Sequence, residues 1–156
     1  MFIRPANESD ISDIKRLMDR NFDDVISRYH SLAVVDKFKE HNSVESLQVQ
    51  LNWKKIYVAV IEGTIGGTGA FANFGTEEVP IYSVSNLFIL PELHGKGIGG
   101  QILDVLINEA RDNDASTFHV PSSRNAVNFY AKYGFRVDDL QPDENDEITW
   151  MTLVIS

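Results

Sequence analysis

The chain has 156 residues, a formal net charge of −9 at pH 7, no cysteine and 43% hydrophobic residues. This length and composition predict a single domain, residues 1–156, with a substantial core. The lack of cysteine excludes disulfides, thiolate zinc sites and a cysteinyl acyl-enzyme, and an acidic chain with no basic stripe is not typical of nucleic-acid binding. No apolar run is long enough to span a membrane and no signal peptide is visible, so we expect a cytoplasmic protein without a membrane partner.

The first half of the chain predicts a short strand followed by helices. Asn7 is a suitable helix N-cap, and Asp10 is the acidic partner of a capping pair. Apolar residues then recur at helical spacing from Ile11 to Met18. In chain order, we expect a strand at 1–5, a helix after Asn7, a helix at 31–40 and another that starts near Ser43.

The second half begins with strand periodicity and ends in a hairpin. Three β-rich segments joined by short turns predict an antiparallel meander. The strand that follows the next helix is reached by a helical crossover, so we expect it to lie parallel to the last meander strand. The elements expected are strands at 56–61, 65–73 and 81–90, a helix at 101–111, a strand at 116–120, a helix at 125–133 and a hairpin of 135–137 with 147–155. The acidic connection of this hairpin, which includes Asp138, indicates a solvated turn.

A glycine-rich segment, residues 94–100, lies between the strand at 81–90 and the helix that follows. This layout directs free backbone N–H groups and the positive end of a helix dipole to one point, which is typical of phosphate binding. A Walker A loop is excluded because Lys96 is followed by Gly97. A dinucleotide fingerprint matches Gly95, Gly97 and Gly100, but the next strand does not end in the acidic residue that would bind a ribose, and the preceding meander is not a parallel sheet.

Two motifs resemble those of the GNAT superfamily of N-acetyltransferases. Residues 87–99 resemble its central motif, in which a strand and a proline corner precede a glycine loop. Residues 128–135 resemble its second motif, Phe-Tyr-x-x-x-Gly-Phe, and residues 3–6 are similar to its usual start. The chain departs from the pattern at His94, where Arg or Gln is usual, and at Ser123, where Asn is usual.

The resemblance implies an α/β (α+β) fold with a mixed, splayed β-sheet, an antiparallel meander and helices on both faces. It implies acetyl-CoA as co-substrate. The pantetheine arm would pair with the strand at 81–90, the pyrophosphate would lie on the glycine loop at 94–100, and Ser123 and Asn125 would lie near the arm. By this interpretation the cofactor-binding residues are Leu87, Phe88, Ile89, His94, Gly95, Lys96, Gly97, Ile98, Gly99, Gly100, Ser123 and Asn125.

The resemblance also suggests catalytic roles. Tyr130 matches the general acid that protonates the leaving sulfur, and the N–H of Ile89 is a candidate oxyanion donor. His119 is a candidate general base, acting directly or through water, although a packing role for this histidine remains open, as does deprotonation by water alone. The strand position near Ser83 cannot supply a base, and Glu77 and Glu78 lie in a preceding turn.

We therefore expect an N-acetyltransferase that moves an acetyl group from acetyl-CoA to a primary amine by direct attack in a ternary complex. The alternatives are a non-catalytic acyl-CoA-binding or regulatory protein and a nicotinamide enzyme. Residues 21–55 would shape the acceptor pocket. Acidic residues that could attract a small amine, polyamine or peptide amine are Asp23, Asp24, Glu77 and Glu78. His30 and His41 have no ligand-spaced partners and are expected at the surface with no metal, and a homodimer is compatible with this interpretation.

Overall fold

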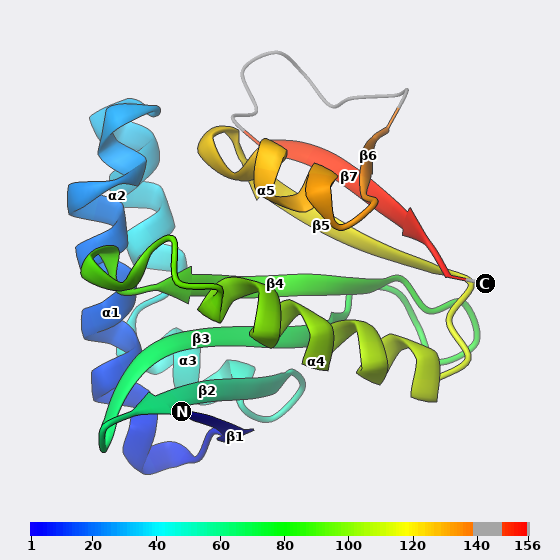
Figure 1. The fold of residues 1–156 in the computed structure, drawn as a ribbon, viewed down its shortest axis with the longest axis horizontal. Helices are drawn as coiled ribbons and strands as arrows, with labels where there is room; N and C mark the ends of the chain where they lie inside the picture. The colour runs from blue at the N-terminus through cyan, green and yellow to red at the C-terminus, as the bar shows by residue number, and fades with distance from the viewer. Residues whose placement is uncertain (139–147, 156) are drawn as a thin grey trace.

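The computed structural model describes residues 1–138 and 148–155. In this part of the chain, seven strands form one mixed sheet in the order β1-β2-β3-β4-β5-β7-β6 (Figure 1). The strands are β1 (Phe2–Pro5), β2 (Lys55–Ile61), β3 (Thr64–Asn73), β4 (Tyr82–Ile89), β5 (Thr117–Ser123), β6 (Arg136–Val137) and β7 (Ile148–Val154). Every neighbouring pair is antiparallel except β4 and β5. The predicted meander, parallel pair and final hairpin are therefore confirmed.

Helices cover both faces of the sheet, with α4 and α5 on one face and α1, α2 and α3 on the other (Figure 1). The helices are α1 (Ile11–Asp24), α2 (Leu32–His41), α3 (Val44–Gln50), α4 (Ile98–Asp112) and α5 (Val127–Lys132). Short 3₁₀ turns lie at Glu8–Asp10, Ile26–Arg28, Pro91–Leu93 and Arg124–Ala126. None of these helices, within residues 1–138 and 148–155, combines the length and apolar character needed to cross a membrane.

Local chemistry explains the 3₁₀ turn Glu8–Asp10, which leads directly into α1. Asn7 and Asp10 form the predicted capping box. The side chain of Asn7 accepts a hydrogen bond from the backbone N–H of Ser9, and the carboxylate of Asp10 accepts one from the backbone N–H of Asn7 at 2.9 Å. Arg4 of β1 donates two hydrogen bonds to the same carboxylate, at 2.8 and 3.0 Å. This contact fixes α1 relative to β1, and the apolar face of α1 then packs on β3 and β4.

Two boundaries differ from the sequence prediction by three residues. Helix α4 begins at Ile98 rather than at Gln101, because the left-handed Gly97 is its N-cap and the next two glycines already lie in its first turn. Strand β5 continues past Val120 to Ser123, through Pro121. The alternation of hydrogen bonds between β5 and β7 directs the nitrogen of residue 121 away from β7, so the missing N–H of proline removes no bond from that pair.

The sheet is open at its centre. Ser83 and His119 form the one registered pair between β4 and β5, and beyond it the two strands diverge (Figure 1). On its other side β4 carries a bulge: between the pairs Ala70–Ser85 and Thr68–Phe88, one residue of β3 opposes two residues of β4. Asn86, within the bulge, has a positive φ of 52°.

Candidate active site

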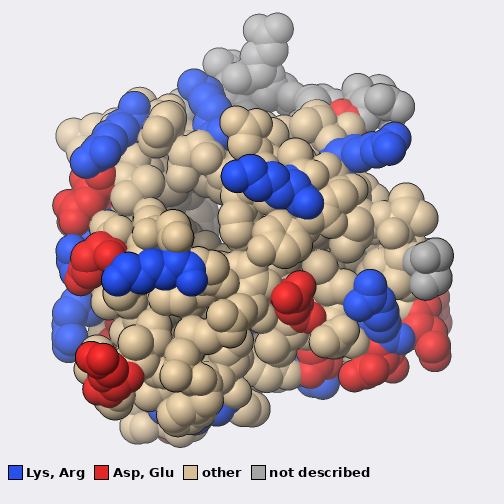
Figure 2. Space-filling view, viewed as in Figure 1, with Lys and Arg blue, Asp and Glu red and all other residues tan. Residues whose placement is uncertain are grey.

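The divergence of β4 and β5 leaves two connected cavities. The larger, of about 470 Å³, is lined by the end of β4, the glycine loop, the first turn of α4 and helix α5. The smaller, of about 180 Å³, lies between the two strands and helices α1 and α2. Figure 2 shows a hollow on the α4–α5 face with basic side chains on either side of it. Residues that line both cavities are Ile26, Leu87, Phe88, Ser123, Ala126 and Tyr130.

The edge of β4 that faces this cleft carries backbone groups that do not bond to β3. The N–H of Leu90 donates to the carbonyl of Gly66 on β3 at 2.9 Å. Hydrogen-bonded and non-hydrogen-bonded pairs alternate along an antiparallel ladder, so the neighbouring pair, Ile89 with Gly67, directs its N–H and C=O groups away from the β3–β4 seam. The N–H of Ile89 therefore points to the cleft side, as its predicted role as an oxyanion donor requires.

The carbonyl of Ile89 is held by two side chains. Nδ2 of Asn21, from α1, donates to this oxygen at 2.8 Å, and Nε2 of His94 lies at 2.8 Å from it. A carbonyl oxygen can only accept, so His94 carries its proton on Nε2. Neutral His94 then has no N–H left for a phosphate, and only the imidazolium form could donate from Nδ1. In this structure His94 joins the glycine loop to the end of β4.

The glycine loop directs an uncapped helix terminus into the larger cavity. Gly95 and Gly97 have φ values of 79° and 81°, which L side chains rarely adopt, and an added Cβ would meet no atom within 4 Å at either position. No side chain caps the N-terminus of α4. Of the described residues that line this cavity none is Asp or Glu, whereas Lys132 of α5 contributes a cation. The loop therefore suits a phosphate, even in an acidic protein.

Several predicted residues meet at this cavity, which is lined by Leu87, Phe88, Ile89, His94, Gly95, Gly97, Ile98, Gly99, Gly100, Ser123 and Asn125. Lys96 is exposed and does not line it. Within the described part of the chain, the buried Oδ1 of Asn125 has no hydrogen-bond partner. A buried acceptor of this kind is normally satisfied, so it fits an amide N–H of a bound pantetheine arm.

Aromatic residues of α5 close over the start of α4, and the sequence did not single them out for this position. A Cβ at Gly100 would lie 1.8 Å from the hydroxyl of Tyr133, and one at Gly99 would lie 3.3 Å from the ring of Phe129. The two glycines therefore let α5 approach α4 closely. Both aromatic side chains also line the larger cavity.

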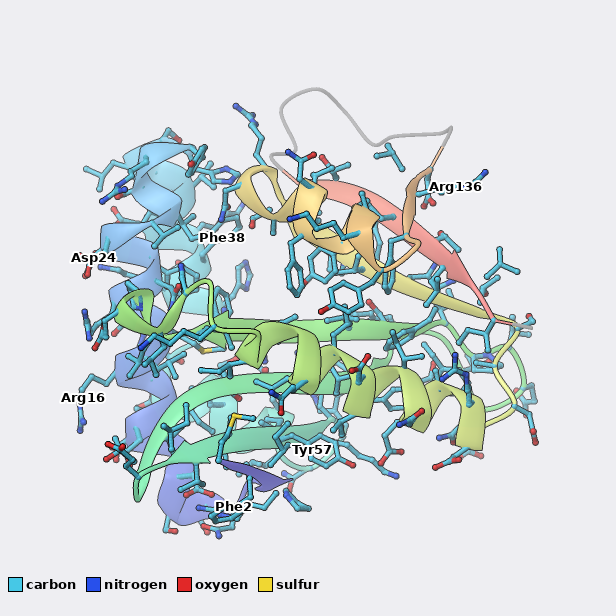
Figure 3. The ribbon with its side chains drawn as sticks, viewed as in Figure 1. Phe2, Arg16, Asp24, Phe38, Tyr57 and Arg136 are labelled. Atoms are coloured by element: carbon cyan, nitrogen blue, oxygen red, sulfur yellow. The ribbon has the colours of Figure 1, made fainter. Side chains whose placement is uncertain are left out.

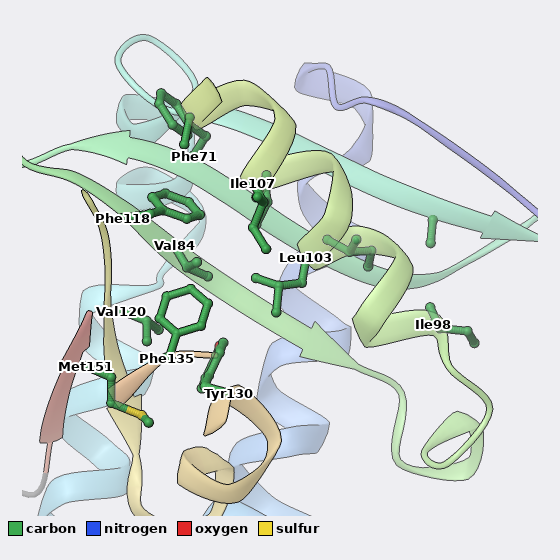
Figure 4. Close-up of a cluster of buried hydrophobic side chains, with 14 residues drawn as sticks. Phe71, Val84, Ile98, Leu103, Ile107, Phe118, Val120, Tyr130, Phe135 and Met151 are labelled. Atoms are coloured by element: carbon green, nitrogen blue, oxygen red, sulfur yellow. The ribbon is translucent and has the colours of Figure 1, made fainter. Parts of the chain in front are cut away.

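Tyr130 lies where the two cavities meet and packs against Phe135, Val120 and Met151 in the core between α5 and β5 (Figure 4). It is only 5% exposed. Burial raises the pKa of its phenol above the usual value, so the group keeps its proton at neutral pH. The same desolvation would raise the pKa of a CoA thiol formed beside it, so a thiolate there would be a stronger proton acceptor than in water.

The structure does not place His119 beside Tyr130 at the two cavities. Its Nδ1 lies 3.0 Å from the hydroxyl of Thr152, which itself donates to Asp138 at 2.6 Å, so Nδ1 carries the proton. Nε2 lies 3.3 Å from the hydroxyl of Thr117. Within the described part of the chain, His119 is not among the residues that line either cavity. The geometry supports a packing role between β5 and β7, and the base assignment stays a prediction.

The acidic residues suggested for the acceptor lie away from the cavities. Asp23 pairs with Lys39, and Asp24 lies 3.7 Å from Arg20 and points outward from α1 (Figure 3). The turn that carries Glu77 and Glu78 is exposed. None of these four lines either cavity, so their proximity to an acceptor is not supported.

The surface assignment of His30 was wrong. This residue is 7% exposed and packs edge-on against Phe38, with the ring centroids 5.7 Å apart. His41 is exposed, as expected. Phe38 of α2 packs against His30, a contact that the sequence pattern alone did not indicate.

Asn21 is the site residue that a closer sequence argument could have found. It lies on the apolar face of α1, between Met18 and Phe22, and is 4% exposed. A polar side chain in such a position must find a buried partner, which indicates a contact with another element. The partner itself, the carbonyl of Ile89, is 68 residues away and could not be read from that pattern.

Solved structures share this fold over nearly the full chain. PaiA N-acetyltransferase from Thermoplasma acidophilum, in complex with coenzyme A, has a TM-score of 0.84 at 16% identity, covering 99% of this chain and 98% of that one. A GNAT family acetyltransferase from Brucella melitensis, in complex with acetyl-CoA, has a TM-score of 0.72 at 20% identity, covering 99% and 88%. Ribosomal-protein-alanine N-acetyltransferase from Brucella melitensis has a TM-score of 0.70 at 18% identity, covering 99% and 100%.

The fold defined by this open sheet and its glycine-loop helix is therefore the GNAT fold. A family model described as an acetyltransferase (GNAT) domain matches residues 25–156. The chain belongs to the GNAT acetyltransferase family, which excludes the nicotinamide alternative, as does the antiparallel arrangement of β2, β3 and β4. A comparison of the sequence with curated proteins gives no significant match.

Proposed function

We propose that this protein transfers an acetyl group from acetyl-CoA to a primary amine by direct attack in a ternary complex. One observation carries the proposal: two cavities, one lined by the glycine loop and one lined by α1, α2 and the opened strands, share the buried residue Tyr130. Such an arrangement admits a donor from one side and an acceptor from the other, with the reacting atoms between them.

The larger cavity fits the acyl-CoA donor. The uncapped N-terminus of α4, with the left-handed Gly95 and Gly97 before it, would bind the pyrophosphate. The pantetheine arm would lie along the free edge of β4, where Asn125 offers a buried acceptor. Both lone pairs of the Ile89 carbonyl are already used by Asn21 and His94, so the arm would pair with other backbone groups.

The chemistry needs few groups. A neutral amine attacks the thioester carbonyl, the new C–N bond forms, and the C–S bond breaks. The N–H of Ile89 would stabilise the oxyanion, a contribution of about 3–4 kcal/mol for such a donor. Tyr130 would give its proton to the leaving thiolate and regain one from solvent. Among the described residues that line the smaller cavity there is no carboxylate and no histidine, so we propose that the amine proton leaves to water.

The test has two stages. Thermal shift with acetyl-CoA, CoA and NADH should show stabilisation by the two CoA compounds, which measures donor binding. A free-thiol assay with acetyl-CoA and a panel of primary amines should then show release of CoA that depends on an amine. Stabilisation without turnover would support the alternative, a non-catalytic acyl-CoA-binding protein. Lack of stabilisation at millimolar acetyl-CoA would overturn the assignment of the donor site.

A further inference from the structure

A chain of hydrogen bonds from α3 orients a polar side chain at the smaller cavity. Nζ of Lys54 is 3.0 Å from Oε1 of Gln50 and 2.9 Å from the hydroxyl of Ser85. An ammonium group can only donate, so the Gln50 atom that it contacts is the oxygen. Nε2 of Gln50 then faces Ser46 and the carbonyl of His41, at 3.0 and 3.3 Å, which are both acceptors. The orientation of the Gln50 amide is therefore determined by its contacts.

This orientation determines the amide of Asn86 as well. The Asn86 atom that lies 2.6 Å from Oε1 of Gln50 must be the donor Nδ2. Oδ1 is then the amide atom that remains to accept a hydrogen bond. Asn86 lines the smaller cavity from the bulge of β4, next to Leu87, which lines both cavities. The bulge and the Gln50 contact together hold Asn86 at the wall of the smaller cavity.

The rest of the cavity is mainly apolar. Its apolar lining residues are Phe22, Ile26, Phe38, Val84, Leu87, Phe88, Val120, Pro121, Ala126 and Ile148. The other polar lining groups are largely engaged: Nδ2 of Asn42 donates to the carbonyl of Phe38, Ser122 donates to the carbonyl of Ser123, and Ser85 accepts from Lys54. None of the described lining residues is charged. An ammonium ion in this cavity would thus lose its hydration without gaining a counter-ion. Lys54, the cation of the hydrogen-bond network, does not line the cavity.

We propose that the acceptor is a neutral primary amine on a small apolar body, and that Oδ1 of Asn86, oriented by Gln50, accepts a hydrogen bond from its N–H. The inference deepens the proposed function, because it assumes that the smaller cavity is the acceptor site. The apolar body lies against the phenylalanines of α1, α2 and β4, and the amine nitrogen lies near Asn86 and Tyr130. Gln50 is a positioning residue, and Asn86 binds the substrate.

Asn86 and Gln50 can be tested with variants that keep the backbone. Asn86→Gly removes the amide while allowing the φ of 52°, and Asp114→Gly is a matched control at a φ of 57° in the turn after α4. Gln50→Met removes the acceptor oxygen for Asn86, whereas Gln50→Glu retains one. Initial rates are measured with acetyl-CoA and three acceptors: 2-phenylethylamine, spermidine and an alanyl dipeptide.

We expect kcat/KM for 2-phenylethylamine to exceed that for spermidine by about tenfold or more. Asn86→Gly should raise the KM for 2-phenylethylamine about tenfold and leave the KM for acetyl-CoA unchanged. Gln50→Met should raise the amine KM by a smaller factor, and Gln50→Glu should restore it. Asp114→Gly should change neither KM.

The outcomes separate this inference from the proposed function. Acetylation of spermidine or the dipeptide in preference to 2-phenylethylamine would overturn the acceptor class and leave the acetyltransferase assignment intact. Acetylation of 2-phenylethylamine with an unchanged KM in Asn86→Gly would overturn the role of Asn86. No amine-dependent turnover with any of the three, despite acetyl-CoA binding, would overturn the proposed function together with the inference.

Discussion

Asn21 of α1 donates a 2.8 Å hydrogen bond to the carbonyl oxygen of Ile89, the last residue of β4. The same Nδ2 donates to the carbonyl of Leu17 at 3.0 Å, so two hydrogen bonds hold this nitrogen. His94 binds the Ile89 oxygen from the glycine loop. The carbonyl of Ile89 thus joins β4 to α1 and to the glycine loop, and the N–H of the same residue points to the cleft side. The position of the proposed oxyanion donor depends on α1 as well as on the sheet.

We expect Asn21→Leu to lower kcat by about tenfold with little change in the KM for acetyl-CoA, because a small displacement of Ile89 misplaces the oxyanion donor. The control is Asn113→Leu, which also removes an amide that donates to a carbonyl one helical turn earlier, at the exposed end of α4. The double variant Asn21→Leu/His94→Ala should raise the activation free energy for kcat by more than the sum of the two single variants, because each single variant leaves the Ile89 carbonyl one donor. Additive losses would argue against a shared role.

Tyr130→Phe should lower kcat by about 100-fold and leave acetyl-CoA affinity nearly intact. The ring keeps its edge-on contacts with Phe129 and Phe135, so the fold should not change. Tyr82→Phe, at a ring stacked on Phe71, is the control. Single-turnover rates and calorimetric titration with acetyl-CoA measure the two effects. A Tyr130→Phe enzyme with full activity would remove the phenol from the mechanism.

Gly97→Ala should weaken acetyl-CoA binding through the backbone alone. Its φ of 81° is costly for alanine, about 1–2 kcal/mol, whereas the space around it is open. Gly63→Ala is a close match: its φ is 80°, it also has no atom within 4 Å of the added Cβ, and it lies in the turn between β2 and β3. Both variants should lose similar thermal stability, and only Gly97→Ala should lose affinity for acetyl-CoA. Equal affinities would show that the loop conformation does not matter for binding.

His119→Gln tests the histidine base directly. We expect kcat and its pH dependence to remain unchanged, because the ring nitrogens of His119 face Thr117 and Thr152 and not the cavities. The measurement is a pH–rate profile of kcat at saturating acetyl-CoA and amine. Loss of an ionisation from the acidic limb, together with a large fall in kcat, would restore His119 as the base.

Lys54 should make the stability of the fold depend on pH in the alkaline range. Burial lowers its pKa from 10.5 to about 8. Between these values the unfolded chain binds more protons than the folded chain, so stability rises with pH across this window and the charged lysine is least favourable below pH about 8. Lys54→Met should therefore flatten the rise in Tm between pH 8 and 10. Lys37→Met, at an exposed position of α2, should leave it unchanged. An unaltered slope in Lys54→Met would contradict the effect of burial.

Local sequence patterns were enough to predict most helices and strands and the glycine loop. Asn7 with Asp10 predicted the start of the first helical segment, alternation and short turns predicted the β2–β3–β4 meander, and the glycines before Ile98 predicted an exposed helix N-terminus. Each of these signals depends on residues within a few positions of one another. Such local preferences persist in the fold because packing did not oppose them.

The positions of the side chains proposed to act near the acceptor depend on tertiary contacts. The direction of His119 depends on Thr152 of β7, the orientation of Asn86 depends on Gln50 and Lys54 of the α3 region, and the Ile89 carbonyl is bound from α1. The hydrogen bonds His119–Thr152, Asn86–Gln50 and Asn21–Ile89 join residues 33 or more positions apart, and no sequence period encodes them. The sequence by itself therefore determined a glycine loop that leads into an uncapped helix N-terminus, and only the packing of distant elements decided which side chains line the cavity proposed for the acceptor.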